Sequence, residues 1–188
     1  MSLSVTQPLI YGHQSSLQNR THSWSARYST HQSGFNQLIQ HIGHVDRAWH
    51  LAWNPKKPLL ASCSADKTVR LYSYKRDPST GEIIFTNTSS ISTGHSKTVR
   101  GVAWAPSGET LATASFDANI GIWEQERDEN GEHAGGEWEC MSTLEGHETE
   151  CKSVAYSCTG TLLATCSRDK TVWIWEGPSY LLIIFEPS

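Results

Sequence analysis

The sequence predicts an all-β fold built from about three four-stranded antiparallel units, and three observations support this. A Gly-His dipeptide recurs at residues 43, 94 and 146, so its copies are 51 and 52 residues apart. An Asp follows each His by 22 residues and an aromatic residue follows it by 28. Eight tryptophans against two methionines favour strands over a helical bundle. A unit repeated at a fixed period packs against its own copies. The three sets are His44, Asp66 and Tyr72; His95, Asp117 and Trp123; and His147, Asp169 and Trp175.

Each unit shows short apolar runs separated by turn residues, as in LAWNPKKPLLASCSADKTVRLY and VAWAPSGETLATASFDANIGIW. These runs predict three strands joined by tight turns. A fourth strand is expected before each Gly-His, at Phe35 to Gln40, Glu82 to Thr86 and Trp138 to Leu144. The polar segments KRDPSTGE and EQERDENGEHAGGE are expected to be exposed loops. The second is acidic and is interpreted as a solvated hairpin, with a binding role as the alternative.

The two ends of the chain differ from the repeats in composition. Residues 1–34 contain eight Ser, four Gln, two Arg and no acidic residue, which predicts a disordered polar extension. A mitochondrial transit peptide is the alternative interpretation of this segment. Residues 177–188 are predicted to form an apolar tail outside the repeat pattern, and the run from Tyr180 to Phe185 is too short to span a bilayer.

Charge and cysteine content limit the classes of ligand. A net charge of −4 gives no basic surface for nucleic acid, so protein partners are expected. The five cysteines form an odd set without a CxxC pair, which indicates a reducing compartment. We expect buried structural thiols, with Cys63 and Cys166 at equivalent repeat positions, rather than a metal site. No metal and no cofactor are predicted.

The spacing of Gly-His, Asp and Trp resembles that of WD40 β-propeller blades, which implies an incomplete propeller over residues 35–176, with blade motifs at 43–72, 94–123 and 146–175. In that architecture the His donates to the Asp and accepts from a Ser or Thr hydroxyl, which accepts from the Trp indole. Such sets also resemble a hydrolase triad, but a catalytic constellation occurs once and has an oxyanion hole, so no enzyme is predicted. The four-residue sets, called tetrads below, are His44, Ser62, Asp66 and Tyr72; His95, Thr113, Asp117 and Trp123; and His147, Thr165, Asp169 and Trp175.

The turns that carry the His and Asp residues share one rim of a propeller. Side chains just before each Asp, and three and five residues after each His, are therefore expected to lie together there. Arginines and aromatic residues among them predict a protein-binding patch, while the alternative is that the cations only solubilise the rim. The predicted binding residues are Arg168, Phe116, Arg47, Trp49, Arg100 and Lys152, and Ala65, Thr98 and Glu150 are their neighbours.

Residues 94–124 and 144–176 resemble the second and third blades of the WD40 proteins of the cytosolic iron-sulfur protein assembly (CIA) targeting complex. The Ser-Arg-Asp-Lys turn at 167–170 is the most specific element, and Arg168 matches the rim arginine of that family. The resemblance implies a non-catalytic adaptor that, with other CIA subunits, brings a late-acting Fe-S carrier to cytosolic and nuclear apoproteins. It implies a cytoplasmic location, with the nucleus as a second one. The alternative is another WD40 scaffold, such as a ubiquitin-ligase substrate receptor or a chromatin-associated reader.

The family propeller has seven blades, whereas three repeats are present here. The chain is therefore expected to be a fragment or truncated form with an open blade edge at each end. Open edges predict self-association. The apolar tail is expected either to aggregate or to cover one of these edges.

Overall fold

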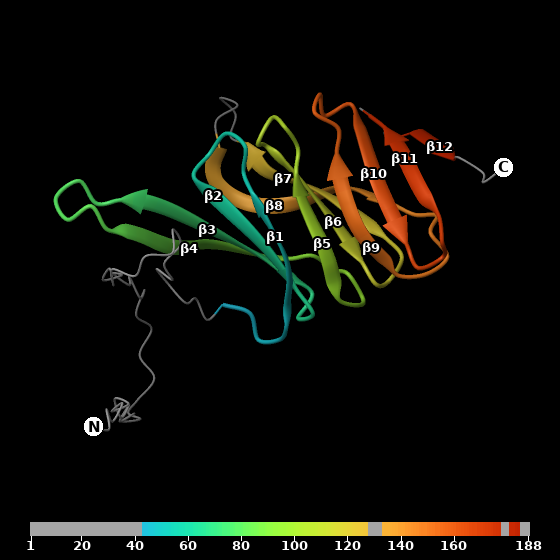
Figure 1. Cartoon of the computed structure of the whole chain (residues 1–188), viewed down its shortest axis with the longest axis horizontal. Coiled ribbons are helices and arrows are strands. Elements are labelled where there is room, and N and C mark those ends of the chain that lie inside the picture. Colours follow the sequence, from blue (N-terminus) through green and yellow to red (C-terminus); the bar gives the residue numbers. More distant parts are fainter. Residues whose placement is uncertain (1–42, 128–132, 178–180, 185–188) are drawn as a thin grey trace, which may run out of the picture.

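Three four-stranded antiparallel sheets stand side by side in the computed structural model, which describes residues 43–127, 133–177 and 181–184 (Figure 1). Within these ranges there is no helix. The predicted all-β class with repeated four-stranded blades is thus confirmed. Residues 1–34, the expected strand at 35–40 and the middle of the acidic loop at 128–132 lie outside the described residues. No helix among the described residues is long and apolar enough to cross a membrane.

Each sheet, called a blade below, is formed by four consecutive strands. The first contains β1 (Ala48–Trp53), β2 (Leu59–Ser64), β3 (Thr68–Arg76) and β4 (Ile83–Ser92). The second contains β5 (Val99–Trp104), β6 (Thr110–Ser115), β7 (Ile120–Arg127) and β8 (His133–Leu144). The third contains β9 (Cys151–Tyr156), β10 (Leu162–Ser167), β11 (Val172–Glu176) and β12 (Leu181–Ile184).

The turn between the second and third strands has the same backbone conformation in every blade. Lys67, Ala118 and Lys170 each follow the tetrad Asp, and their φ angles are 69°, 77° and 74°. Each of them donates its N–H to the carbonyl three residues earlier, at Ser64, Ser115 or Ser167. This is a type I turn followed by a left-handed residue, a common hairpin connection. The turn therefore places the Asp carboxylate at the same point on each blade.

The fourth strands show where sequence and structure differ. β4 contains the expected segment except Glu82 and continues to Ser92, and β8 contains its expected segment and begins earlier, at His133. The tail, expected outside the repeat, supplies β12, which pairs with β11 from Trp173↔Ile184 to Glu176↔Leu181. The tail thus lies along the free side of β11, which agrees with the expectation that it could cover an open edge. An uncharged apolar run after a turn can hydrogen-bond to the free side of β11, even without the blade motif.

The blades pack face to face through two apolar cores. In the core between the first and second blades, Val69 and Leu71 of β3 meet Trp104, Leu111 and Trp123 of the second blade, all at most 7% exposed. In the core between the second and third blades, Ile120 and Ile122 take the places of Val69 and Leu71. There they meet Leu163 and Trp175 of the third blade, again buried. Each fully buried side chain of this size contributes about 1.5–3 kcal/mol.

The outer faces of the first and third blades carry the same types of residue but remain exposed. Trp53 occupies in β1 the position of Trp104 in β5 and is 57% exposed, against 7% for Trp104. It packs against Tyr74 at a ring-centroid distance of 5.3 Å. On the third blade Val172, which matches Val69, is 55% exposed. The central blade is therefore the best buried of the three.

Candidate functional site

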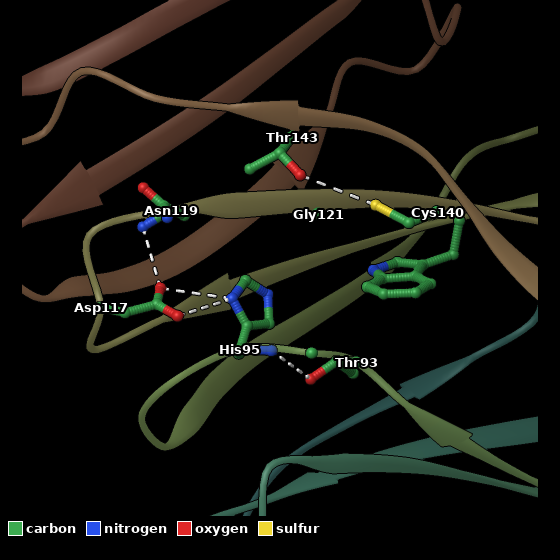
Figure 2. A pocket seen from close by; sticks show the side chains of 9 residues that line it. Thr93, His95, Asp117, Asn119, Gly121, Cys140 and Thr143 are labelled. Atoms are coloured by element: carbon green, nitrogen blue, oxygen red, sulfur yellow. Dashed lines mark hydrogen bonds and ion pairs between the residues drawn. The ribbon is translucent and has the colours of Figure 1, made fainter.

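The structure brings the members of each tetrad together. In the second blade His95 Nδ1 lies 3.0 Å from Asp117 Oδ2, and His95 Nε2 lies 2.9 Å from Thr113 Oγ1. The Trp123 indole donates to the same hydroxyl at 3.0 Å. Figure 2 shows His95 and Asp117 facing each other from two different turns. Each hydrogen bond contributes about 1 kcal/mol net, and the loss of one partner leaves a buried polar group unsatisfied at a cost of about 1–3 kcal/mol.

The third blade repeats this network, and the first differs in its aromatic member. His147 Nδ1 is 2.8 Å from Asp169, and Trp175 donates to Thr165 Oγ1 at 3.0 Å. In the first blade, His44 is 2.9 Å from Asp66 and 2.6 Å from Ser62 Oγ. Tyr72 stands at the position of the indole, and it is 7% exposed. A phenol places its hydroxyl differently from an indole N–H, so the looser first network expected on this ground remains a prediction.

The tetrad carboxylates are held ionised. Burial raises the pKa of Asp66, but hydrogen bonds from Thr68, from the Val45 N–H and from His44 outweigh it and lower that pKa to about 2. Asp169 is lowered in the same way, with Thr171 as the main donor. Threonines at 68 and 171 were not singled out from the sequence, although both stand two residues after the Asp. In the second blade that position is Asn119, whose backbone N–H bonds to Asp117.

The predicted rim residues form a continuous line across all three blades. The Arg100 guanidinium carbon lies 4.9 Å from the centroid of the Trp49 ring, and that of Arg47 lies 5.8 Å from it. The rings of Trp49 and Phe116 are 6.4 Å apart. Lys152 Nζ lies 3.9 Å from the Phe116 centroid. Two adjacent aromatic rings, each in contact with cations, therefore join the first blade to the third.

Glu150 extends this line to Arg168. Its carboxylate lies 3.6 Å from Lys152 Nζ and 3.3 Å from Arg168 Nη1, while the Arg168 N–H donates to the Glu150 carbonyl at 3.0 Å. Desolvation raises the pKa of Glu150, but Arg168 and Lys152 together lower it. The Arg168 side chain is nevertheless 70% exposed. An exposed ion pair of this kind contributes little to stability, so a stronger acceptor can replace Glu150.

We call the seven residues of this line the rim ladder. They come from the first strands and the adjoining turns, and β5 contacts both β1 and β9, so the line follows the inner edge of the three blades. The sequence predicted that these positions share one rim, but not the order of contacts or the bridging carboxylate. The members are Arg47, Trp49, Arg100, Phe116, Lys152, Glu150 and Arg168.

The cysteines only partly follow the expectation of buried thiols. Cys63 and Cys151 are buried, and burial raises the pKa of each thiol to about 12. Cys166 is half-buried because it lies on the uncovered face of the third blade, whereas the equivalent Cys63 lies under the second. Cys140 and Cys158 are exposed, on the outermost strand β8 and in a turn, so the expectation was wrong for them. Among the described residues no group of three or more His, Cys, Asp or Glu could hold a metal ion.

Comparison with known proteins decides the family. The protein-family model described as "WD domain, G-beta repeat" matches the sequence at residues 35–73, 87–124 and 138–176. Each match covers one blade motif. The chain belongs to the WD40 repeat family. The tetrads are thus the hydrogen-bond networks of three WD40 repeats, and the rim ladder lies at the turns that these repeats present together.

Curated WD40 relatives match over most of these repeats. A "probable cytosolic iron-sulfur protein assembly protein 1" of Mycosarcoma maydis is 50% identical over 74% of this chain and 37% of its own length. The protein of that name from Malassezia globosa is 58% identical over 50% of this chain and 28% of its own. A "probable cytosolic Fe-S cluster assembly factor" of Schizosaccharomyces japonicus is 47% identical over 71% of this chain and 19% of its own. The chain therefore spans well under half the length of these relatives.

Proposed function

We propose that this WD40 chain is a non-catalytic adaptor of cytosolic iron-sulfur protein assembly. The names of similar proteins refer to cytosolic iron-sulfur protein assembly, and two of these proteins are 50% and 58% identical to the chain over the aligned residues. The observation that carries the proposal is the rim ladder, because it joins three blades into one exposed surface of cations and aromatic rings. Such a surface suits a protein partner with acidic and apolar side chains.

Its partners in this role are the other subunits of the CIA targeting complex, a late-acting Fe-S carrier and the apoproteins that receive clusters. The cluster is cargo, and the chain contributes contacts and positioning. The location is cytosolic, with nuclear apoproteins as a second set of clients. Catalysis is not part of the proposal, since the His, Ser or Thr, and Asp sets occur three times in equivalent places and are hydrogen-bonded inside blades.

Arg168 is proposed as the anchor of this surface. Its guanidinium is mostly exposed and already oriented by Glu150, so an incoming carboxylate or backbone carbonyl can be bound by two parallel N–H groups. Lys at this position keeps the charge but loses the planar fork. Arg168→Lys is therefore expected to weaken binding and Arg168→Ala to abolish most of it.

The test is co-purification of tagged chain with CIA proteins from a eukaryotic extract, quantified by mass spectrometry. Arg168→Ala is compared with Arg76→Ala, which removes an exposed arginine of β3 away from the rim. We expect recovery of CIA proteins to fall at least fivefold for Arg168→Ala and to stay unchanged for Arg76→Ala. Recovery of ubiquitin-ligase subunits or chromatin proteins in place of CIA proteins would contradict the proposal.

A further inference from the structure

One position of the third strand differs in every blade, and it lies next to the tetrad. In each blade this residue pairs, between the third and second strands, with the hydroxyl residue of the tetrad. The pairs are Arg70 with Ser62, Gly121 with Thr113 and Trp173 with Thr165. The shared register makes them equivalent positions of the repeat. A guanidinium, a hydrogen and an indole therefore occupy the same place on three otherwise similar blades.

In the third blade the indole of Trp173 fills the space above the Gly-His dipeptide. Its ring lies 5.0 Å from the His147 ring and 5.3 Å from that of Trp175, and a β-carbon added at Gly146 would collide with it. In the first blade two side chains of β3 cover the dipeptide, because a β-carbon added at Gly43 would collide with the Tyr72 hydroxyl and would lie 3.4 Å from the Arg70 Cδ. In these two blades the strand itself supplies the side chain that covers the dipeptide.

In the second blade Gly121 leaves this space open. A β-carbon there would lie 2.6 Å from Trp123 Nε1 and 2.9 Å from Thr113 Oγ1, so a larger residue would disturb the tetrad. The result is a cavity of about 290 Å³, seen from close by in Figure 2, which we call the second-blade pocket. Its walls include Gly94, His95, Gly121, Trp123, Cys140 and Thr143.

We propose that the second-blade pocket binds an aromatic side chain, an indole in particular, presented by a partner protein. The pocket lies at the small end of ligand sites, which begin near about 300 Å³, and so suits one side chain rather than a larger ligand. The third blade shows the arrangement of such a ring, which lies over a Gly-His dipeptide at 37° to the His147 ring and beside a tetrad Trp. Aromatic rings favour this spacing of about 4.5–7 Å.

An aromatic ring fits this pocket better than a guanidinium of the Arg70 kind. A guanidinium needs acceptors, and the Asp117 carboxylate in the pocket wall already accepts from His95 and from the backbone N–H groups of Ser96 and Asn119. The two glycines leave flat backbone on which a ring can lie. This inference stands on the repeat geometry and does not depend on the proposed role in iron-sulfur assembly.

The exposed thiol of Cys140 in the pocket wall allows a direct test in the full chain. Alkylation by iodoacetamide is followed by mass spectrometry at Cys140 and at Cys158, an exposed thiol in a turn of the third blade. N-acetyltryptophanamide is the probe, and a ring of this size binds with a Kd of about 1 mM. At about 10 mM it should slow the alkylation of Cys140 about tenfold and leave Cys158 unchanged.

Two further comparisons make the result specific. Thr143→Tyr, at an exposed position opposite Gly121, should fill the pocket and remove the protection of Cys140. Ser90→Tyr is the matched control opposite Arg70, and it should retain the protection. Less than twofold slowing at Cys140 in the folded wild-type chain, equal slowing at Cys158, or equal protection by N-acetylargininamide would each overturn the proposal.

Discussion

The ammonium group of Lys152 lies 3.9 Å from the centroid of the Phe116 ring and so joins the third blade to the second. Lys152 stands in β9 and Phe116 in the turn after β6, and Glu150 holds the lysine from its other side at 3.6 Å. The contact is partly exposed, which places it in the weaker range of cation-aromatic interactions.

A double-mutant cycle with Lys152→Met and Phe116→Leu measures this contact. We expect a coupling energy of about 0.5–1 kcal/mol in urea unfolding, since each single change removes one half of the pair and keeps most of its apolar volume. The same cycle with Arg76→Met in place of Lys152→Met should give no coupling. Coupling near zero for the first pair would show that the two side chains do not interact in solution.

Thr113→Val tests the tetrad of the second blade. Valine keeps the shape of threonine but leaves His95 Nε2 and Trp123 Nε1 without their shared hydroxyl in a buried site. The free energy of unfolding should fall by about 2–3 kcal/mol. Thr110→Val on the same strand removes one bond to Glu124 at a half-buried position and should cost less than about 1 kcal/mol. Similar losses for both variants would contradict the network.

Stability should fall in acid because the tetrad carboxylates are ionised in the folded chain. The pKa of Asp66 is lowered from 3.8 to about 2, so its contribution is complete above about pH 4 and is lost as the pH falls toward 2. Asp66→Asn should remove about 2 kcal/mol at pH 7 and make the stability curve less steep between about pH 4 and 2, while Asp117 and Asp169 keep part of the slope. The same slope in the wild-type chain and in Asp66→Asn would contradict this.

Ala118→Gly should stabilise the second blade. Ala118 has a φ of 77°, a conformation that costs a residue with a β-carbon about 1–2 kcal/mol, and glycine avoids this cost but loses more chain entropy on folding. The expected net gain is about 0.5 kcal/mol, measured by thermal unfolding. Ala114→Gly, inside β6 and fully buried, is the contrasting control and should destabilise. A loss of stability on Ala118→Gly would show that this turn is unstrained.

Amide hydrogen exchange should be fastest at the outer blades. β1 carries Leu51 and Trp53, which are 59% and 57% exposed, whereas the equivalent strand β5 has buried neighbours on both faces. We expect the amides of β1 to exchange at least about tenfold faster than those of β5. Equal protection of the two strands would also contradict a looser first tetrad.

The sequence predicted those parts of the molecule that repeat. The spacing from His95 to Asp117 and Trp123 is enough to infer a hydrogen-bond network, because His95 precedes β5 and the other two lie in the β6–β7 hairpin that pairs with β5. β12 could not be inferred in the same way, since Leu181–Ile184 carries no repeat motif that would place it beside β11. Glu150 was noted only as a neighbour, because its bridge to Lys152 and Arg168 depends on side-chain directions. The role of Gly121 could not be inferred from the sequence, because its equivalence to Arg70 and Trp173 is known only from the strand register.

The rim ladder has a consequence for how a partner and the fold affect each other. Trp49 meets Phe116 and Arg100 from another sheet, and Phe116 meets Lys152 from a third. A partner that contacts these side chains at the same time binds the packed blades and does not bind the separated sheets. By thermodynamic linkage, a partner bound at the rim stabilises the packing between blades. A change that weakens this packing lowers the affinity for the partner. A substitution in either apolar core between blades can therefore weaken partner binding without changing a surface residue.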